Sequence, residues 1–251
     1  MSEQHPPCYL VTGGSKGIGK AICLQLAQQG ARVVILARPS SALDETTRMV
    51  QQSSPNSFSL ACDLANTVSI NAAAASARTQ LARLDGVVHN AGDIGPIKSI
   101  FGTDQDAWQR NIVVNLLGVQ ALTQALSPLF EGGHRVRVTT ISSGAAVRPI
   151  PSWSAYCTAK AGLEMWTKCL ALEGAEVNLS AVSVAPGIVN TDMQAYIRGS
   201  AVQDFPLHAQ FVGYYGNGQL TNAEDVATKL VPLITQHTME QSGQRFDVRD
   251  L

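Results

Sequence analysis

Residues Cys8–Lys20 read CYLVTGGSKGIGK, an apolar run that passes into a glycine-rich turn and then into a helical pattern over Ala21–Gln29. The unbroken apolar run predicts a buried strand, and the apolar spacing after the turn predicts a helix. Glycines let the backbone approach a pyrophosphate closely, and a helix that begins there points free amide groups at the anion. Many glycine-rich turns only reverse the chain, but this one lies between a strand and a helix, the context that a dinucleotide site requires.

The rest of the chain alternates between strand-like and helix-like segments, without a linker, repeat or low-complexity tract. Strands are expected at 31–37, 57–62, 85–89, 136–141, 179–184 and 244–248, and helices at 41–52, 68–84, 106–129, 151–173 and 223–236. This alternation predicts an α/β fold, a single doubly wound parallel sheet of about seven strands that is Rossmann-like, with helices on both faces. We expect residues 1–251 to form one domain, with its ligand cleft at the carboxyl ends of the strands.

Composition excludes several classes of function. The formal net charge is -1, and Lys and Arg form no stripe that would suit nucleic acid or an anionic membrane. Apolar runs of 18 residues are absent, and the first residues, MSEQHPPC, do not resemble a secretory signal. The sequence therefore predicts a cytoplasmic protein with no nucleic-acid or membrane partner.

Cysteine and histidine spacings indicate neither disulfides nor a metal site. The five cysteines are odd in number and scattered, and the histidines show no ligand spacing; they are Cys8, Cys23, Cys62, Cys157 and Cys169, and His5, His89, His134, His208 and His237. We expect reduced, mostly buried thiols and no metal.

The end of the second predicted strand indicates which dinucleotide binds. An acidic residue there would accept the ribose hydroxyls of NAD, whereas this strand ends in Arg38, with Lys16 in the glycine-rich turn nearby. Two cations favour a 2'-phosphate, so the sequence predicts NADP(H). The alternative is that Arg38 is a solvated loop charge.

Two further turns follow predicted strands. Asp63 could accept the adenine amino group or, as an alternative, cap the helix that begins near Thr67. Asn90-Ala91-Gly92 would border the cofactor or form a simple turn. Because the carboxyl ends of parallel strands meet at one edge, these turns should lie near Gly13.

The stretch Ile141–Lys160, ISSGAAVRPIPSWSAYCTAK, carries groups suited to carbonyl chemistry. Tyr156 and Lys160 are four residues apart, so on a helix they share one face. A nearby ammonium favours the phenolate, which predicts a lowered tyrosine pKa. Ser143 follows a predicted strand and would point its hydroxyl at the same place. A Tyr-x-x-x-Lys pair can also be an ordinary surface pair.

Three features around this stretch are unusual. Asn115 is expected in the middle of a long helix, where asparagine is unfavourable, so we predict that it distorts the helix. Pro186-Gly187 should end a strand sharply and begin a cleft-lining segment with Thr191 and Asp192. Residues 193–218 have poor periodicity and several aromatic residues, which predicts a mobile substrate lid or, alternatively, a packed surface helix.

Together these motifs resemble the short-chain dehydrogenases/reductases over nearly the whole chain. The resemblance implies that Tyr156 is the proton donor and that Ser143 orients the substrate carbonyl. It also implies that Lys160 holds the nicotinamide ribose, that Asn115 supports a proton-relay water, and that Thr191 contacts the nicotinamide carboxamide. The implied cofactor contacts are Gly13, Ser15, Lys16, Gly17, Ile18, Gly19, Arg38, Asp63, Leu64, Asn90, Ala91, Gly92, Tyr156, Lys160, Pro186, Gly187, Val189, Thr191 and Met193.

Within that family the sequence looks most like the sepiapterin reductase and benzil reductase group. The resemblance is carried by segments around Trp153, by residues 191–194 and by the ending 242–250. It implies substrate contacts from Ser143, Trp153, Tyr156 and Asp247, where the Asp247 carboxylate would suit the guanidine-like edge of a pterin. The alternative for Asp247 is a solvent-exposed residue at a strand end.

We therefore expect an NADPH-dependent carbonyl reductase that acts on a ketone or vicinal dicarbonyl. One alternative is an NADP-dependent alcohol dehydrogenase that oxidises a hydroxysteroid or sugar. A second is a regulator that senses NADPH without catalysis, although such a protein would not need the proton donor. The resemblance also implies a homodimer or homotetramer that associates through long helices.

Overall fold

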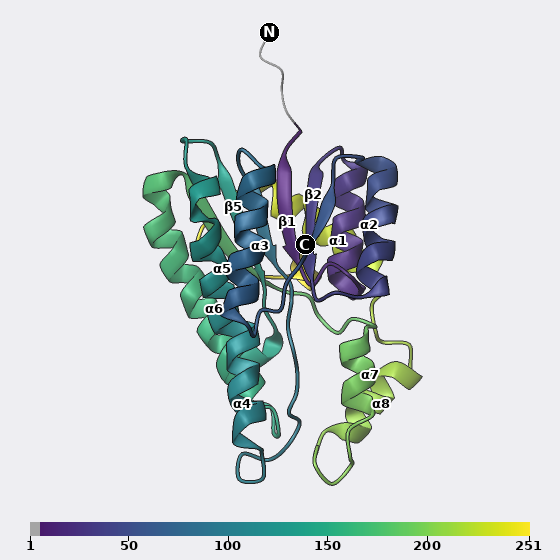
Figure 1. Cartoon of the computed structure of the whole chain (residues 1–251). Coiled ribbons are helices and arrows are strands. Elements are labelled where there is room, and N and C mark those ends of the chain that lie inside the picture. The colour runs from purple at the N-terminus through teal and green to yellow at the C-terminus, as the bar shows by residue number, and fades with distance from the viewer. Residues whose placement is uncertain (1–5) are drawn as a thin grey trace.

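The computed structural model describes residues 6–251. His5 and the rest of residues 1–5, which belong to the N-terminal segment MSEQHPPC, lie outside the described residues. Seven parallel strands form one sheet in the order β3-β2-β1-β4-β5-β6-β7 (Figure 1). Their bounds are β1 (Cys8–Thr12), β2 (Arg32–Ala37), β3 (Phe58–Ala61), β4 (Gly86–His89), β5 (Val136–Ile141), β6 (Leu179–Ala185) and β7 (Arg245–Asp247). The predicted Rossmann-like sheet is confirmed.

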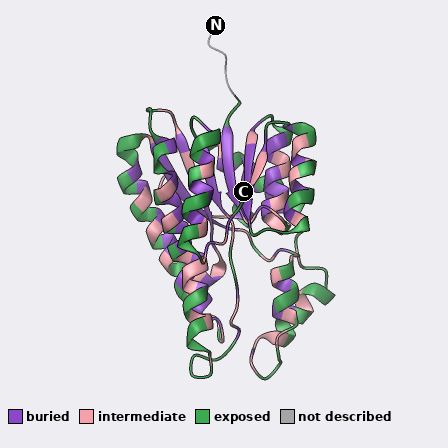
Figure 2. Ribbon diagram, in the orientation of Figure 1, coloured by how far each residue is buried: buried purple, intermediate pink, exposed green. Residues whose placement is uncertain are grey.

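Helices cover both faces of this sheet. They are α1 (Gly17–Gln28), α2 (Ser41–Ser53), α3 (Thr67–Gln80), α4 (Gln105–Ile112), α5 (Gly118–Leu126), α6 (Ser154–Glu173) and α9 (Ala223–Gln236), with short 3-10 turns at Ser127–Phe130, Gly144–Ala146, Gly174–Val177 and Val248–Asp250. Side chains of α1, α2 and α9 pack on one face, and side chains of α3, α5 and α6 on the other. The strands are therefore buried, and the outer sides of the helices are exposed (Figure 2).

The strand order reverses beside β1, which pairs with β2 on one side and β4 on the other. Such a reversal opens a crevice at the carboxyl ends of the strands, because the two following connections diverge to opposite faces. The glycine-rich turn after β1 and the Asn90 turn after β4 meet there. Thr12 joins them, since its Oγ1 accepts hydrogen bonds of 3.0 Å from the backbone amides of both Asn90 and Ala91.

A long helical run, Gln105–Phe130, contains α4 and α5. By length and composition alone it could cross a membrane, with a mean hydropathy of 1.4 over its most apolar window. In this fold the run packs on the sheet, and Leu122 and Leu126 are fully buried in the core. Its apolar character is that of a core helix.

Two short helices, α7 (Asp192–Arg198) and α8 (His208–Gly216), occupy most of residues 193–218 and lie beyond the carboxyl ends of the strands (Figure 1). Phe205, between them, is fully buried and stacks on Trp153 with ring centroids 5.5 Å apart. The segment thus has the packed helices that the alternative interpretation predicted, while movement as a lid stays a prediction.

The cysteines are all free thiols. Cys8, Cys23 and Cys62 are buried, Cys157 is half-buried and Cys169 is exposed. Among residues 6–251 no cluster of three or more His, Cys, Asp or Glu side chains could hold a metal.

Candidate active site

One cleft of about 940 Å³ lies at the carboxyl ends of the strands and brings together most of the predicted site residues. Those that line it are Gly13, Ser15, Lys16, Gly17, Ile18, Arg38, Asp63, Leu64, Asn90, Ala91, Gly92, Tyr156, Lys160, Pro186, Thr191 and Met193. The predicted residues that do not line it are Gly19, Asn115, Ser143, Trp153, Gly187, Val189 and Asp247. The position of these residues relative to the cleft differs from one element to the next.

Two glycines of the glycine-rich turn, Gly13 and Gly19, have no room for a side chain. Gly13 has a φ of +65°, and a Cβ there would lie 2.9 Å from the Cα of Ala91. A Cβ on Gly19 would lie 2.3 Å from the carbonyl oxygen of Gly13, so Gly19 permits close packing of α1 against the turn and need not contact a ligand. In the part of the chain that the structure describes, no side chain caps the N-terminus of α1, so its first amide groups are available to an anion.

Asn90 fixes the shape of this turn. Its Nδ2 donates to the carbonyl oxygens of Thr12 at 3.0 Å and Gly13 at 3.2 Å. The bonds hold the ends of β1 and β4 together, so the turn is more than a simple chain reversal. Asn90 shapes the floor of the cleft through the backbone of its neighbours.

Three cations line the end of the cleft near β2. Arg38 is exposed, and within residues 6–251 its guanidinium forms no ion pair. Lys16 forms an ion pair of 2.5 Å with Asp192 across the cleft, so in this structure it is directed away from Arg38. Arg110 on α4, which the sequence did not single out, lies 3.7 Å from Asp63. Arg38 is thus the cation left available to an anion.

Asp63 does not cap α3. Its Oδ1 accepts from the amide of Ala65 at 2.9 Å, whereas Asn66 provides the cap by accepting from the amide of Ser69 at 3.0 Å. The alternative interpretation of Asp63 as the helix cap is therefore wrong. Its carboxylate lines the cleft beside Arg110.

Tyr156 and Lys160 lie on α6 and face the cleft at the end of β5. They are only 5% and 3% exposed, so they are not an ordinary surface pair. The Lys160 ammonium donates to the carbonyl oxygen of Ile141 at 2.8 Å and lies 5.7 Å from the centroid of the Tyr156 ring. The helix thus places an ammonium beside the phenol, as the spacing predicted.

The predicted acidification of the phenol is wrong for this structure. Burial raises the pKa of Tyr156 to about 12, and this effect outweighs the hydroxyl of Ser143, which lowers it. Burial also lowers the pKa of Lys160 to about 8, against the opposing charge of Glu164. Desolvation disfavours the charged form of both groups, which sequence spacing could not reveal.

Ser143 is the second residue after β5 and lies next to the phenol. Its Oγ accepts from the amide of Ala145 at 3.1 Å and begins the 3-10 turn Gly144–Ala146. Ser142, which the sequence analysis missed, lines the cleft in its place. The hydroxyl of Ser143 is therefore close enough to influence Tyr156, but it is held at the cleft wall.

Asn115 distorts its helix, as predicted. The helix is π-helical over Val113–Leu117, and the fully buried Asn115 side chain donates to the carbonyl oxygens of Asp93 at 2.8 Å and Asn111 at 3.0 Å. A Cβ on Gly92 would lie 2.9 Å from its Oδ1 and 3.6 Å from the Lys160 Nζ. The distortion thus joins the loop after β4 to the helix behind Lys160.

The connection after β6 supplies the last cleft wall. Pro186, Thr191 and Met193 line the cleft. Gly187 has a φ of +76°, which turns the chain, and Val189 is buried in a bridge to Thr221. Gly187 and Val189 therefore shape this connection rather than line the cleft.

Besides Ser143, two predicted substrate contacts, Trp153 and Asp247, do not line the cleft. Trp153 is 5% exposed and packs between Tyr156 and Phe205, so it supports the phenol from behind. Both oxygens of Asp247 accept from the guanidinium of Arg249, at 2.7 and 2.5 Å. The Arg249 hydrogen bonds hold the pKa of Asp247 at about 2, and the carboxylate is not free to bind a pterin in this conformation.

Replacing Lys160 with methionine should stabilise the protein near neutral pH. Burial lowers the ammonium pKa from 10.5 to about 8, so charging Lys160 is unfavourable in the folded state. This penalty is full below the folded pKa and disappears as the pH rises toward the unfolded value. The free energy of unfolding should therefore rise by roughly 1–3 kcal/mol near pH 7, and by much less near pH 9.5, in urea titrations. A variant less stable than the parent near pH 7 contradicts this account.

The cleft residues agree with a known family. A family model described as short chain dehydrogenase matches residues 7–201. The chain belongs to the short-chain dehydrogenase family. Members of this family bind a nicotinamide cofactor and act on CH–OH and C=O groups, so the chain is an oxidoreductase of that kind.

Among short-chain dehydrogenases, the chain is similar to the benzil reductase ((S)-benzoin forming) of Bacillus subtilis (strain 168), with 31% identity over 96% of this chain and 98% of the relative. It is also 32% identical to a 3-oxoacyl-(acyl-carrier-protein) reductase of Synechocystis sp., over 95% of this chain and 94% of that one. The crystal structure of the KRED1-Pglu enzyme has a TM-score of 0.85 at 29% identity and covers 95% of this chain and 99% of that one. The predicted likeness to benzil reductases is confirmed.

Proposed function

We propose that this protein is an NADPH-dependent carbonyl reductase that transfers hydride to a ketone or vicinal dicarbonyl, with Tyr156 as the proton donor. The observation that carries the proposal is that the Tyr156–Lys160 pair lies in the same cleft as the glycine-rich turn after β1. A nicotinamide and a carbonyl could therefore meet beside a phenol.

The residues of the cleft fit a dinucleotide. The start of α1 and the turn at Gly13 suit a pyrophosphate, and Arg38, which has no ion pair among residues 6–251, suits a 2'-phosphate. When bound, the reduced nicotinamide supplies the hydride. Lys160 would hold the nicotinamide ribose and Thr191 the carboxamide.

The raised pKa of Tyr156 suits reduction. A phenol with a pKa of about 12 keeps its proton at neutral pH, so it can donate that proton to the substrate oxygen as the carbonyl becomes a hydroxyl. Ser143 would orient the carbonyl, and Asn115 would support a relay water that returns a proton to the phenol.

Apolar and aromatic side chains border the part of the cleft near Tyr156. Ile94, Met193 and Tyr196 line it, the last two on α7. These groups suit a bulky apolar carbonyl, in keeping with a relative that is a benzil reductase. Both carboxylate oxygens of Asp247 are occupied by Arg249, which does not favour a pterin as substrate. We therefore propose a diketone-like substrate, over which residues 193–218 close.

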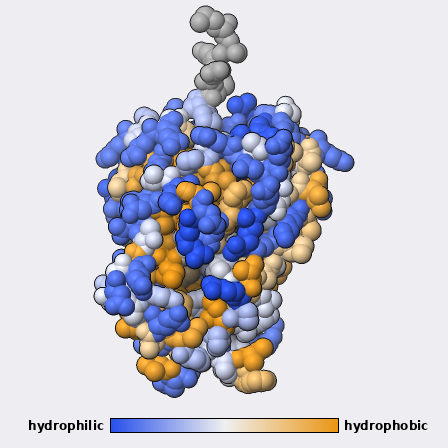
Figure 3. All heavy atoms as spheres, turned by 180° about the vertical axis from the view of Figure 1, so that it is seen from behind, coloured by the Kyte–Doolittle hydropathy of each residue, from blue (hydrophilic) through white to orange (hydrophobic). Residues whose placement is uncertain are grey.

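We further propose a cytoplasmic homodimer or homotetramer. Large apolar side chains are exposed along the long helices: Leu117 is 53% exposed, Met165 60% and Leu172 80%. Apolar patches also lie among polar atoms on the face opposite the view of Figure 1 (Figure 3). Association through these helices would cover such side chains.

An activity screen with NADPH tests the proposal. The purified protein is offered benzil, sepiapterin, simple aldehydes and steroid ketones, and loss of nicotinamide absorbance is followed at saturating NADPH. We expect turnover with benzil-like diketones. Tight NADPH binding without turnover on any carbonyl would instead favour a cofactor sensor.

A further inference from the structure

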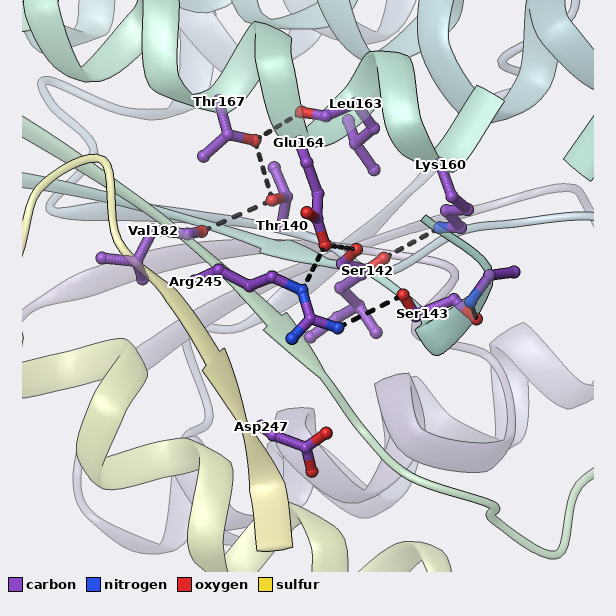
Figure 4. Close-up of polar contacts among 12 residues, drawn as sticks. Thr140, Ser142, Ser143, Lys160, Leu163, Glu164, Thr167, Val182, Arg245 and Asp247 are labelled. Atoms are coloured by element: carbon purple, nitrogen blue, oxygen red, sulfur yellow. Dashed lines mark hydrogen bonds and ion pairs between the residues drawn. The ribbon is translucent and has the colours of Figure 1, made fainter. Parts of the chain in front are cut away.

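A buried carboxylate, Glu164, lies behind the catalytic pair on α6. It is 8% exposed and follows Lys160 by one helical turn, so both side chains face the end of β5. Its Oε1 accepts from the hydroxyl of Ser142 at 2.5 Å and from the Nε of Arg245 at 2.8 Å (Figure 4). None of these three side chains has a role in the proposed proton transfer.

These contacts join three segments that are distant in the sequence. Arg245 comes from β7, and its guanidinium also donates to the carbonyl oxygen of Ser143 at 3.5 Å. The backbone amide of Ser142 is fixed in turn by the carbonyl oxygen of Val184 on β6, at 2.8 Å. The carboxylate is therefore held in one place by Ser142, which follows β5, and by Arg245 on β7.

The charges that face Lys160 are few. From α6 come the neutral Tyr156 and the thiol of Cys157, whose pKa burial raises, together with Glu164. From β7 comes Arg245. The carboxyl end of β5, the π-helical turn and β6 carry no charged residue beside Lys160. The loop after β4 carries Asp93, which lines the cleft next to Gly92, and Asp247 is held by Arg249.

Of the anions near this site, Asp93 lies in the loop after β4, whereas Glu164 lies on the same helix as Lys160, one turn away. Burial pushes Lys160 toward its neutral form, and the charge of Glu164 opposes that effect. Arg245 forms an ion pair with the Oε1 of Glu164, and its positive charge reduces the electrostatic effect of Glu164 on Lys160. The protonation of Lys160 thus depends on a balance between these two charges.

We propose that Glu164 is a positioning residue of the reductase, which Ser142 and Arg245 hold in place and whose charge keeps Lys160 protonated at working pH. The inference rests on the proposed function, in which a charged Lys160 holds the nicotinamide ribose. In this proposal β7 does more than complete the sheet, because its Arg245 reduces the effect of the Glu164 charge on Lys160.

Two single variants test the balance because they should act in opposite directions. Glu164→Gln keeps the size and hydrogen-bonding groups of the side chain but removes its charge, so the alkaline limb of kcat/KM should move down by about one pH unit. Arg245→Gln leaves Glu164 without its counter-charge, so the same limb should move up. The pH profile is measured with the best carbonyl substrate of the screen and NADPH.

The matched control is Glu173→Gln, which makes the same change at an exposed position of α6. The alkaline limb of Glu173→Gln should lie at the same pH as that of the parent. Glu164→Asp keeps the negative charge, so its alkaline limb should lie close to that of the parent. The pH dependence of NADPH binding, followed by nicotinamide fluorescence, should move in the same directions without any substrate. Opposite shifts support the proposal; shifts in one direction, or none, overturn it.

Loss of folding in one variant leaves the test intact. Should Glu164→Gln fail to fold, an upward shift in Arg245→Gln supports the proposal and an unmoved limb overturns it. Should the parent protein reduce no carbonyl, the proposed function fails, while the binding titration still reports the charge of Lys160. The two failures are thus distinguishable.

Discussion

Replacing Tyr156 with phenylalanine should lower kcat for carbonyl reduction about 1,000-fold, the loss that removal of a general acid typically causes. The phenol is 5% exposed and packs against Trp153, so phenylalanine fills the same space and removes only the hydroxyl. The affinity for NADPH should change by no more than about twofold, because the hydroxyl contributes one contact of many. Steady-state kinetics and fluorescence titration of NADPH measure the two quantities.

A control for this variant is Tyr215→Phe on α8, where an exposed tyrosine packs on Arg198 outside the cleft. It removes the same hydroxyl and should leave kcat unchanged. Residual activity of Tyr156→Phe within tenfold of the parent would show that the proton comes from another group, and the assignment of Tyr156 as the donor would then be wrong.

The fold could be predicted because its signals are local. Apolar runs ending in small residues repeat along the chain, and each run became a strand of one parallel sheet. The carboxyl ends of such strands share an edge, so Gly13, Asn90, Ser143 and Gly187 could be placed there without knowledge of any side-chain contact. Asn115 was likewise visible as a local conflict between residue type and helix.

The electrostatics of the site could not be predicted in the same way. Sequence spacing places Lys160 beside Tyr156, but it does not say that both are buried, and burial decides the sign of the tyrosine shift. The resemblance to sepiapterin reductases implied a substrate contact for Asp247, and nothing in the sequence indicates that Arg249, two residues later, holds its carboxylate. Glu164 and Arg245 are 81 residues apart, and only the fold joins them.

Replacing Arg38 with aspartate should reverse the cofactor preference, with kcat/KM for NADPH falling about 100-fold and that for NADH rising. Arg38 follows β2 at the mouth of the cleft and has no ion pair among residues 6–251, so its full charge is available to a 2'-phosphate. A loss of one charge-assisted contact, together with repulsion by the new carboxylate, amounts to about 3 kcal/mol. The same carboxylate can accept the ribose hydroxyls of NADH.

Arg48→Asp provides the matched control, because it makes the same charge reversal on the exposed side of α2. Its ratio of kcat/KM for the two cofactors should stay within about twofold of the parent, since a solvated charge at a distance is screened by salt. Lys16→Ala should have a smaller effect than Arg38→Asp, because Lys16 is already paired with Asp192. An unchanged preference in Arg38→Asp would mean that Arg38 is a solvated loop charge, and the discrimination would have to come from Lys16 or Arg110.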